Sequence, residues 1–410
     1  MIGLCTAYYA RQKGHTVTVL ERGAPDHDSC SRGNAGMIVP SHFVPLAAPG
    51  MPSLGLRMML NPESPFAIQP RADADLVDWA WKFYRAANAE HVARCGPLLR
   101  DLNLASRKAY EELSTAFGDD FGLARRGLLM LCKTAQTLHD EMHLAESARA
   151  LGLAADTLSA EETTSLDPNI GMDVAGSIYF PGDCHLDPAR FVDGLTRRLV
   201  EDGVRFVWNA DVTGWRTVSG GIEAVRTSAG DFSADEYVIA GGSWSSEITR
   251  ALGLSLPLQA GKGYSFTVPA PRQLPEICAI LVEARVAVTP MGGGLRFGGT
   301  MEITGLDQAD RVSPRRVTGI KKSIPDYYPA FRPGDFEGLP IWTGLRPCSP
   351  DGLPYIGRFR DYPNVSAATG HSMMGLSLAP ITGKLMAAVL SGEPPALNIA
   401  ALRPDRFRVG

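Results

Sequence analysis

The first residues of the chain pass from a helical pattern to a buried-strand pattern. Residues 2–13 place Gly3, Ala7 and Ala10 on one stripe at helical spacing. Residues 16–21, TVTVLE, form a nearly continuous apolar run rich in β-branched side chains, as in a strand buried on both faces of a sheet. Because small side chains let a helix lie close to a sheet, we expect a helix packed on a parallel strand.

The pattern of the remaining chain predicts further helices and strands. We expect helices at 71–117 as two segments with the second near 96–117, at 136–150 and within 371–392. We also expect a helix at 188–203 behind an Asp187 N-cap, one capped by Ser243 and one capped by Ser313 with Pro314. We expect strands at 127–134, a hairpin of 204–215 with 221–230, a strand at 235–240, several strands across 258–305 and a strand at 364–370.

The order of these elements predicts the fold class. Helix–strand units occur at the start, near 187–250 and at the end, whereas the blocks between them are richer in antiparallel-type strands. We therefore predict an α/β protein with a discontinuous Rossmann-like nucleotide-binding domain and an interleaved substrate domain of antiparallel sheet and helices. The nucleotide-binding domain is expected to comprise 1–60, 186–255 and 345–410, and the substrate domain 61–185 and 256–344.

Composition excludes several classes of protein. The 410 residues are 45% hydrophobic and 20% charged, with a formal net charge of -4, which gives no basic excess for nucleic acid. The seven cysteines form no CxxC pair, so neither a disulfide framework nor a metal site is expected. No apolar run reaches the roughly 18 residues of a membrane span. We expect a cytoplasmic protein, with peripheral contact to the inner membrane left open.

The opening segment matches the second half of a dinucleotide-binding fingerprint. Gly3 would be the last glycine of G-x-G-x-x-G, and Glu21 follows it at about the spacing of the acid that binds the ribose hydroxyls. An ordinary helix–turn–strand unit is the alternative. The strand and first two glycines of the fingerprint are absent, so we expect the natural chain to begin further upstream.

Two glycine-rich loops could complete a cofactor site. The loop 29–40 contains Gly33, Ala35 and Gly36, which permit close backbone approach to a diphosphate or a flavin ring, although an ordinary flexible loop has the same composition. The segment 367–380 ends a strand and opens a helix, and its N–H groups near 374–376 would present a positive helix end to the cofactor. His371 in this segment could handle a proton or serve as a structural loop histidine.

A single arginine is the candidate for substrate binding. Arg346 lies in WTGLRPCSPDGLPYIG, and a guanidinium holds a carboxylate with two parallel hydrogen bonds. Tyr264, in GKGYSFTV, could bond the same carboxylate. The alternatives are a surface or ion-paired arginine and a tyrosine packed in the core.

Together these segments resemble the FAD-dependent amine and amino-acid oxidoreductases of the D-amino-acid oxidase superfamily, and the bacterial D-amino-acid dehydrogenases (small subunit type) most closely. The resemblance covers nearly the whole chain. It is carried, in order, by TVTVLER, NAGMIVPSHFVPLAAPG, GDCHLDPARF, LQAGKGYSFTV, RFGGTMEI, WTGLRPCSPDGLPYIGR and TGHSMMGLSLAPITG.

The resemblance implies FAD as the cofactor and assigns roles to individual residues. The residues implied to bind or line the cofactor are Gly3, Glu21, Arg22, Asn34, Ala35, Gly36, Val212, Gly241, Gly242, Gly357, Gly370, Met374, Gly375 and Leu376. Arg346 would hold the substrate carboxylate, with Tyr264 and His371 as further candidates in the catalytic site. No metal is implied. Without the first strand, we expect this chain to retain FAD weakly.

The implied reaction is the oxidative deamination of a D-amino acid to a 2-oxo acid and ammonia, by hydride transfer from Cα to flavin N5. This chemistry needs no catalytic triad, and none is found. Oxidation of a secondary amine such as D-hydroxyproline, D-proline, glycine or sarcosine is the nearest alternative. A non-catalytic flavin-fold subunit or a truncated product is the alternative from another class. The expected partners are the small substrate and an electron acceptor such as a quinone or the respiratory chain, with a hetero-oligomer left open.

Overall fold

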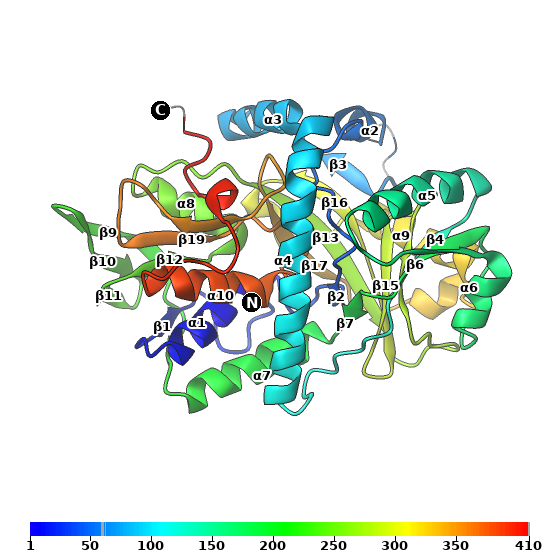
Figure 1. Cartoon of the computed structure of the whole chain (residues 1–410), viewed down its shortest axis with the longest axis horizontal. Coiled ribbons are helices and arrows are strands. Elements are labelled where there is room, and N and C mark those ends of the chain that lie inside the picture. The colour runs from blue at the N-terminus through cyan, green and yellow to red at the C-terminus, as the bar shows by residue number, and fades with distance from the viewer. Residues whose placement is uncertain (59–60, 62, 409–410) are drawn as a thin grey trace.

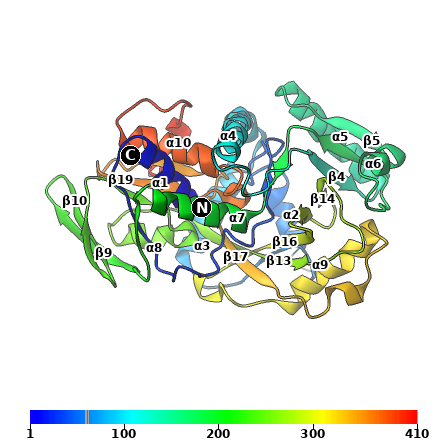
Figure 2. The ribbon, with the colours of Figure 1, turned by 90° about the horizontal axis from the view of Figure 1, so that it is seen from below.

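The computed structural model describes residues 1–58, 61 and 63–408, and it arranges them around two groups of strands. Short parallel strands lie toward the left of Figure 1, and a large, mainly antiparallel sheet lies toward the right. The view from below in Figure 2 shows the same two groups side by side.

The helices of the described residues are α1 (Ile2–Gln12), α2 (Met51–Met58), α3 (Ala74–Ala86), α4 (Ala89–Ala116), α5 (Ala135–Ala150), α6 (Ala160–Leu166), α7 (Pro188–Glu201), α8 (Ser245–Arg250), α9 (Pro314–Tyr327) and α10 (Ala379–Leu390). Short 3-10 helices are η1 (Gly242–Trp244), η2 (Leu306–Gln308), η3 (Pro333–Phe336), η4 (Ser372–Met374) and η5 (Ala400–Leu402).

The strands are β1 (Thr18–Leu20), β2 (Met37–Ile38), β3 (Phe66–Ile68), β4 (Leu128–Cys132), β5 (Asp156–Ser159), β6 (Gly176–Phe180), β7 (Cys184–His185), β8 (Arg205–Val207), β9 (Val212–Val218), β10 (Gly221–Thr227), β11 (Gly230–Ser233), β12 (Tyr237–Ile239), β13 (Gln259–Val268), β14 (Cys278–Leu281), β15 (Val286–Met291), β16 (Gly294–Thr304), β17 (Trp342–Cys348), β18 (Tyr355–Arg358) and β19 (Val365–Thr369).

Parallel pairing in the first group confirms the predicted α/β class. Strand β1 pairs in parallel with β8, and β12 pairs in parallel with β19, while β18 adds to β19 in the antiparallel direction. The two parallel pairs belong to separate sheets. A Cβ built on Gly3 lies 3.4 Å from the Cβ of Ala240, so the start of α1 touches the end of β12.

Helix α1 is held mainly by other helices. It packs against α10 and α7, and α10 also packs against α4, the long helix that runs down the middle of Figure 1. Gly383 of α10 makes the closest approach, because a Cβ there would lie 2.5 Å from the carbonyl oxygen of Cys5. Ala7 and Ala10 are buried in α1. The small-residue stripe therefore serves helix–helix packing.

The second group is a single twisted sheet. Within the described residues it has nine strands, in the order β17-β13-β16-β15-β14-β4-β6-β5, with β3 added to β16. Tyr264, Phe266 and Val268 of β13 pack with Ile320 and Ile324 of α9, which covers this face of the sheet. The opposite face of β13, β16 and β17 contacts the loop that precedes β2.

One of the predicted domain boundaries cuts through the edge strand of this sheet. The division expected between 344 and 345 falls inside β17, whose residues all belong to the large sheet. The division expected after residue 60 lies outside the described residues. The other divisions, near 185 and 255, fall between elements, and the domain assignment remains a proposal.

Several predicted elements are confirmed and two helix starts are wrong. Asp187 caps α7 by accepting from the N–H groups of Ala189 and Arg190, as predicted. The helix expected near 96–117 begins at Ala89 instead, because Asn88 provides a side-chain N-cap and Pro97 is accommodated inside α4. The helix expected from 371 begins at Ala379, with Pro380 in its first turn, where a missing N–H does no harm.

Other local expectations are also corrected. The segment 204–215 does not form one hairpin arm: β8 joins β1, whereas β9 pairs with β10, and Asn209 with φ 54° turns the chain between them. Ser243 does not cap α8. It lies buried in η1 and its hydroxyl donates to the carbonyl of Leu345 at 3.4 Å. Ser313 precedes α9 without a side-chain cap bond.

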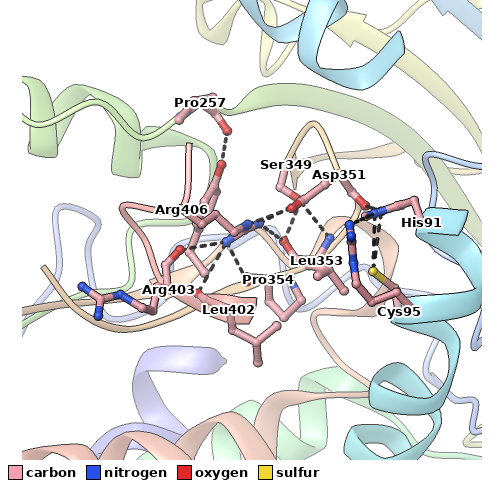
Figure 3. A network of polar contacts seen from close by, with 12 residues as sticks. His91, Cys95, Pro257, Ser349, Asp351, Leu353, Pro354, Leu402, Arg403 and Arg406 are labelled. Atoms are coloured by element: carbon pink, nitrogen blue, oxygen red, sulfur yellow. Dashed lines mark hydrogen bonds and ion pairs between the residues drawn. The ribbon is translucent and has the colours of Figure 1, made fainter. Parts of the chain in front are cut away.

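The C-terminal segment is fastened to the turn after β17 by a buried ion pair (Figure 3). Arg406 donates from Nε to Asp351 Oδ2 at 2.7 Å and from Nη2 to Asp351 Oδ1 at 2.8 Å. It also donates to the carbonyl of Leu353 at 2.7 Å, and its guanidinium lies 4.0 Å from the ring centroid of Tyr355. His91 of α4 bonds the carbonyl of Asp351 at 2.8 Å. Three distant segments therefore meet at one turn.

Candidate active site

Several of the expected cofactor residues lie at the carboxyl ends of the parallel strands. Glu21 follows β1, Gly241 follows β12 and Gly370 follows β19. Ligands of open parallel sheets bind at these ends, and the N-terminus of α1 lies beside the end of β12. Gly370, with φ 77°, adopts a backbone conformation that favours glycine. The arrangement fits the diphosphate and ribose of a dinucleotide.

Glu21, the expected ribose-binding acid, lies directly after β1. It is half-buried, and its Oε1 accepts the N–H of Gly23 at 2.9 Å and lies 3.8 Å from His27 Nε2. The neighbouring Arg22 stacks its guanidinium 3.7 Å from the ring centroid of Trp244, which follows Gly242. Val212 begins β9, opposite Thr227. These contacts hold the end of β1 against the Gly241–Gly242 turn.

Side chains of the large sheet form hydrogen bonds with residues 28–36, a segment that overlaps the glycine-rich loop 29–40 and is called loop 28–36 below. Ser265 of β13 donates to the carbonyl of Gly33 at 2.8 Å. Arg296 of β16 donates from Nη1 to the carbonyls of Arg32 at 3.1 Å and Asn34 at 2.9 Å. Strands β13 and β16 of the large sheet therefore hold this loop through its backbone carbonyl groups.

The loop also fits tightly against its neighbours. Trp342 of β17 donates to Asp28 Oδ1 at 3.0 Å, and its ring occupies the space that a side chain at Gly33 would fill. Asn34 Oδ1 accepts the N–H of Gly36, whose φ is 80°. A Cβ on Gly36 would overlap the carbonyl of Leu186, so only glycine fits there. Ala35 faces Gly298 of β16, whose built Cβ lies 4.0 Å from the Cβ of Ala35.

The segment after β19 is braced from α4 and α10. Tyr110 donates to the carbonyl of Leu376 at 2.7 Å. The N–H of Met374 donates to the carbonyl of His371 at 2.9 Å, and Gly375 ends η4. Because α10 begins only at Ala379, the segment offers a 3-10 turn to the cofactor and not the start of an α-helix. This corrects the expected helix end.

His371 has the surroundings of a structural histidine. It is 3% exposed, its Nε2 bonds Thr382 Oγ1 of α10 at 2.9 Å, and its Nδ1 has no partner among the described residues. Burial lowers the pKa of His371 to about 3, so the ring is neutral near neutral pH. A neutral ring with this pKa is a poor proton acceptor, so these contacts favour the structural role, and the proton-transfer role stays a prediction.

Two expected site residues lie away from the others. Gly357 of β18 faces Ile399 and Pro404 of the C-terminal segment, each 3.9 Å from a built Cβ. Tyr264 is 1% exposed in the core under α9, and it donates to Glu302 Oε2 at 2.8 Å. Tyr264 pairs with Thr343, three residues from Arg346, so the two side chains point to opposite faces of the sheet. Tyr264 therefore cannot share a ligand with Arg346.

Arg346 is a partly buried cation without an acidic partner. Its Nη1 donates to the carbonyl of Thr300 at 2.7 Å, and no described carboxylate forms an ion pair with it. The guanidinium lies on Gly263, where any side chain would overlap it. Burial lowers the pKa of Arg346, because the charged guanidinium loses contact with water and no described acidic side chain offsets that loss. Binding of an anion here stays a prediction.

The residues that sequence reasoning missed are those that act from another strand. Trp342, Ser265 and Arg296 lie more than two hundred residues from the loop that they hold. No local motif marks them, since their role depends on the register of β13, β16 and β17. No group of three or more metal-ligating side chains occurs in the part of the chain that the structure describes.

The whole chain matches a known family. The model of the DAO family, described as FAD dependent oxidoreductase, matches residues 1–389. The chain therefore belongs to the DAO family, and it is an FAD-dependent oxidoreductase. The predicted family and the predicted FAD cofactor are confirmed.

Relatives and solved structures refine this assignment. The D-amino acid dehydrogenases of Granulibacter bethesdensis and Bradyrhizobium diazoefficiens are each 32% identical to this chain, with 99% of this chain and 97% of each relative covered. Glycine oxidase from Geobacillus kaustophilus shares the fold with a TM-score of 0.78 at 23% identity, covering 100% of this chain and 96% of that one. L-proline dehydrogenase from P. horikoshii shares it with a TM-score of 0.71 at 18% identity, covering 99% and 95%.

The helices give no sign of a membrane span. None of the helices in the described residues is long and apolar enough to cross a membrane.

Proposed function

We propose that this protein oxidises a D-amino acid at Cα to the 2-oxo acid and ammonia. The observation that carries the proposal is the Arg346 guanidinium, partly buried, set on Gly263 and without an acidic partner. A carboxylate would supply the missing charge through two parallel hydrogen bonds. The D-amino acid dehydrogenases at 32% identity support the substrate class.

In this proposal the chain binds and orients, and it does little acid–base chemistry. Arg346 holds the carboxylate, which fixes Cα relative to the loop 33–36 and the turn 370–376. FAD, when bound, accepts the hydride that leaves Cα. The resulting imine is hydrolysed by water to the 2-oxo acid and ammonia. The neutral, buried His371 keeps the site free of a competing cation.

The electron acceptor forms the second part of the proposal. The relatives are named dehydrogenases, so we propose that electrons pass on to a quinone-type acceptor and not to oxygen. A quinone held in a membrane would bring the protein to that membrane as a peripheral partner. Oxidation of glycine or a cyclic secondary amine is the second candidate, favoured by the folds named glycine oxidase and L-proline dehydrogenase.

An anaerobic titration of the FAD-loaded protein tests the proposal. We expect D-amino acids to bleach the flavin absorbance and L-amino acids to leave it unchanged, with release of ammonia. Bleaching by D-proline, glycine or sarcosine alone would select the second candidate. R346A should raise the substrate concentration for half-bleaching at least about 100-fold, as for a charged hydrogen bond pair, and R346K should recover part of it. Unchanged binding in R346A would reject the clamp.

A further inference from the structure

Strand β16, which lies on the far side of β13 from Arg346, contains a β-bulge. In the antiparallel pair of β13 and β16, Tyr264 lies opposite Gly299 and Lys262 lies opposite Glu302, with a register shift between them. Two residues of β16, Thr300 and Met301, therefore oppose Gly263 alone. Bulges of this kind re-aim side chains and often lie beside active sites.

Thr300 is held in a conformation that a threonine avoids. Its φ of 71° lies in the left-handed region, where β-branched residues are strained by about 1–3 kcal/mol and where a bulge usually carries glycine. Thr300 is 6% exposed, and its hydroxyl has no hydrogen-bond partner among the described residues. A glycine would relieve the strain and remove the unpaired hydroxyl, so the backbone conformation does not explain a threonine here.

The side chain of Thr300 shares a face with Arg346. Gly299 and Glu302 both face α9: a Cβ on Gly299 would lie 3.3 Å from Ile320, and Glu302 accepts the hydroxyl of Tyr264. The two residues between them therefore face the opposite side, as the paired residues of a bulge do. A Cβ on Gly261 of that face would overlap Met301, which confirms the direction for one of the two.

A second buried hydroxyl on a strained residue lies beyond Cys348. Ser372 follows His371, which forms an isolated bridge with Cys348, two residues after Arg346. It has φ 51° and is 8% exposed, and its hydroxyl lies beside the Cys348 thiol. Strained residues with buried hydroxyl groups therefore occur on both sides of Arg346. Such groups are rare in folded proteins and are expected where a ligand completes them.

We propose that the Thr300 hydroxyl donates a hydrogen bond to the substrate carboxylate held by Arg346. The proposal rests on the proposed function, since it needs an α-amino carboxylate at this site. The Thr300 carbonyl already takes the Nη1 of Arg346 at 2.7 Å, so a carboxylate on the remaining N–H groups lies beside the hydroxyl of the same residue. The bulge thus positions the Arg346 guanidinium through the Thr300 carbonyl, and it places the Thr300 hydroxyl as a further hydrogen-bond donor to the same carboxylate.

Three variants at position 300 separate binding from packing. T300V keeps the β-branched shape and loses the hydroxyl, T300S keeps the hydroxyl, and T300G loses the hydroxyl and relieves the strain. T289V is the matched control, because Thr289 of β15 is also buried with an unpaired hydroxyl, at a position without positive φ. The probes are D-alanine, its product pyruvate, and propionate, which carries the carboxylate without the amine. Their dissociation constants are measured by calorimetry on the FAD-loaded protein.

We expect T300V and T300G to raise the dissociation constants of all three ligands by about 10- to 100-fold, as for the loss of a hydrogen bond to a charged group. T300S should stay within about threefold of the wild type, and T289V should bind normally. T300G should also melt at a higher temperature than the wild type. This rise separates a lost contact from a damaged fold, and the comparison of T300S with T300G stands even if T300V does not fold.

Two results would overturn the inference. Wild-type affinity in T300V and T300G would show that the hydroxyl touches no ligand. A loss confined to D-alanine would place the hydroxyl at the amine instead of the carboxylate. R346A distinguishes these failures from failure of the proposed function: if R346A loses affinity while the Thr300 variants do not, only the role of Thr300 is wrong. If R346A binds all three probes normally, the carboxylate clamp itself is wrong.

Discussion

The guanidinium of Arg346 on β17 lies over Gly263 of the neighbouring strand β13 and fills the space that a side chain at position 263 would occupy, although Arg346 itself is paired with Gly261. The absence of a Cβ on one strand therefore sets the position of a charge on the next. Gly263 also lies opposite the bulge at Thr300, so a single glycine receives the arginine and the bulge together. This geometry makes the site sensitive to one methyl group.

G263A should displace the guanidinium and raise KM for the amino acid by about 10-fold or more, because the clamp loses its bidentate alignment. The flavin content should be unchanged, since the hydrogen bonds that hold residues 28–36 come from Ser265, Arg296 and Trp342. G214A is the control, because a Cβ on that strand glycine of β9 would meet nothing within 4 Å. Steady-state kinetics of both variants test the prediction, and an unchanged KM in G263A would contradict it.

R296M should weaken FAD retention. Arg296 donates to the carbonyls of Arg32 and Asn34, and its loss leaves both without that donor and frees the loop. We expect the dissociation constant of FAD, followed by the recovery of flavin fluorescence on release, to rise about 10-fold. R272M, which removes an exposed ion pair with Asp335, should retain FAD normally. Equal retention in the two variants would exclude this role for Arg296.

Removing either partner of the Asp351–Arg406 pair should destabilise the protein. The two side chains are 9% and 12% exposed, so D351N or R406M leaves a buried charge without its counter-ion, at a cost of about 3–5 kcal/mol. R408M breaks the exposed pair with Asp361 and should change the free energy of unfolding by less than about 1 kcal/mol. Urea denaturation measures the three values, and similar losses in R406M and R408M would refute the distinction.

Asp183 should make stability depend on pH. Burial raises the pKa of Asp183 to about 7, although Ser41 donates to it from its hydroxyl at 2.5 Å and its N–H at 3.1 Å. The native state therefore holds a proton that the unfolded state releases near pH 4, so this group's contribution to stability falls as pH rises from about 4 to 7. D183N removes that dependence. The wild-type minus D183N difference in unfolding free energy, measured at several pH values, should decline by up to about 4 kcal/mol across this range; a flat difference contradicts the shift.

Local patterns alone were enough for much of the fold and for part of the cofactor site. The α1 helix, the buried run ending in Glu21 and the Asp187–Pro188 helix start are short-range features, because caps and hydrophobic periodicity act within a few residues. Gly36 and Gly370 adopt the positive φ that their loops require. The helix starts at 89 and 379 were misjudged where Pro97 and the 372–374 turn hid the local signal.

The tertiary structure decided which side chains share a face. Tyr264 lies on a predicted strand, whereas no strand was predicted at Arg346, which lies on β17. The pairing of β13 with β17 turns the two side chains to opposite sides, and one residue of register would have reversed that result. The bulge at Thr300 and the contacts of Trp342 and Arg296 with loop 28–36 likewise depend on strand register. Strand register depends on pairing between segments that are distant in the chain, so local sequence patterns do not reveal it. The sequence by itself therefore determined the helices and strands, whereas tertiary packing decided which side chains lie together at the candidate site.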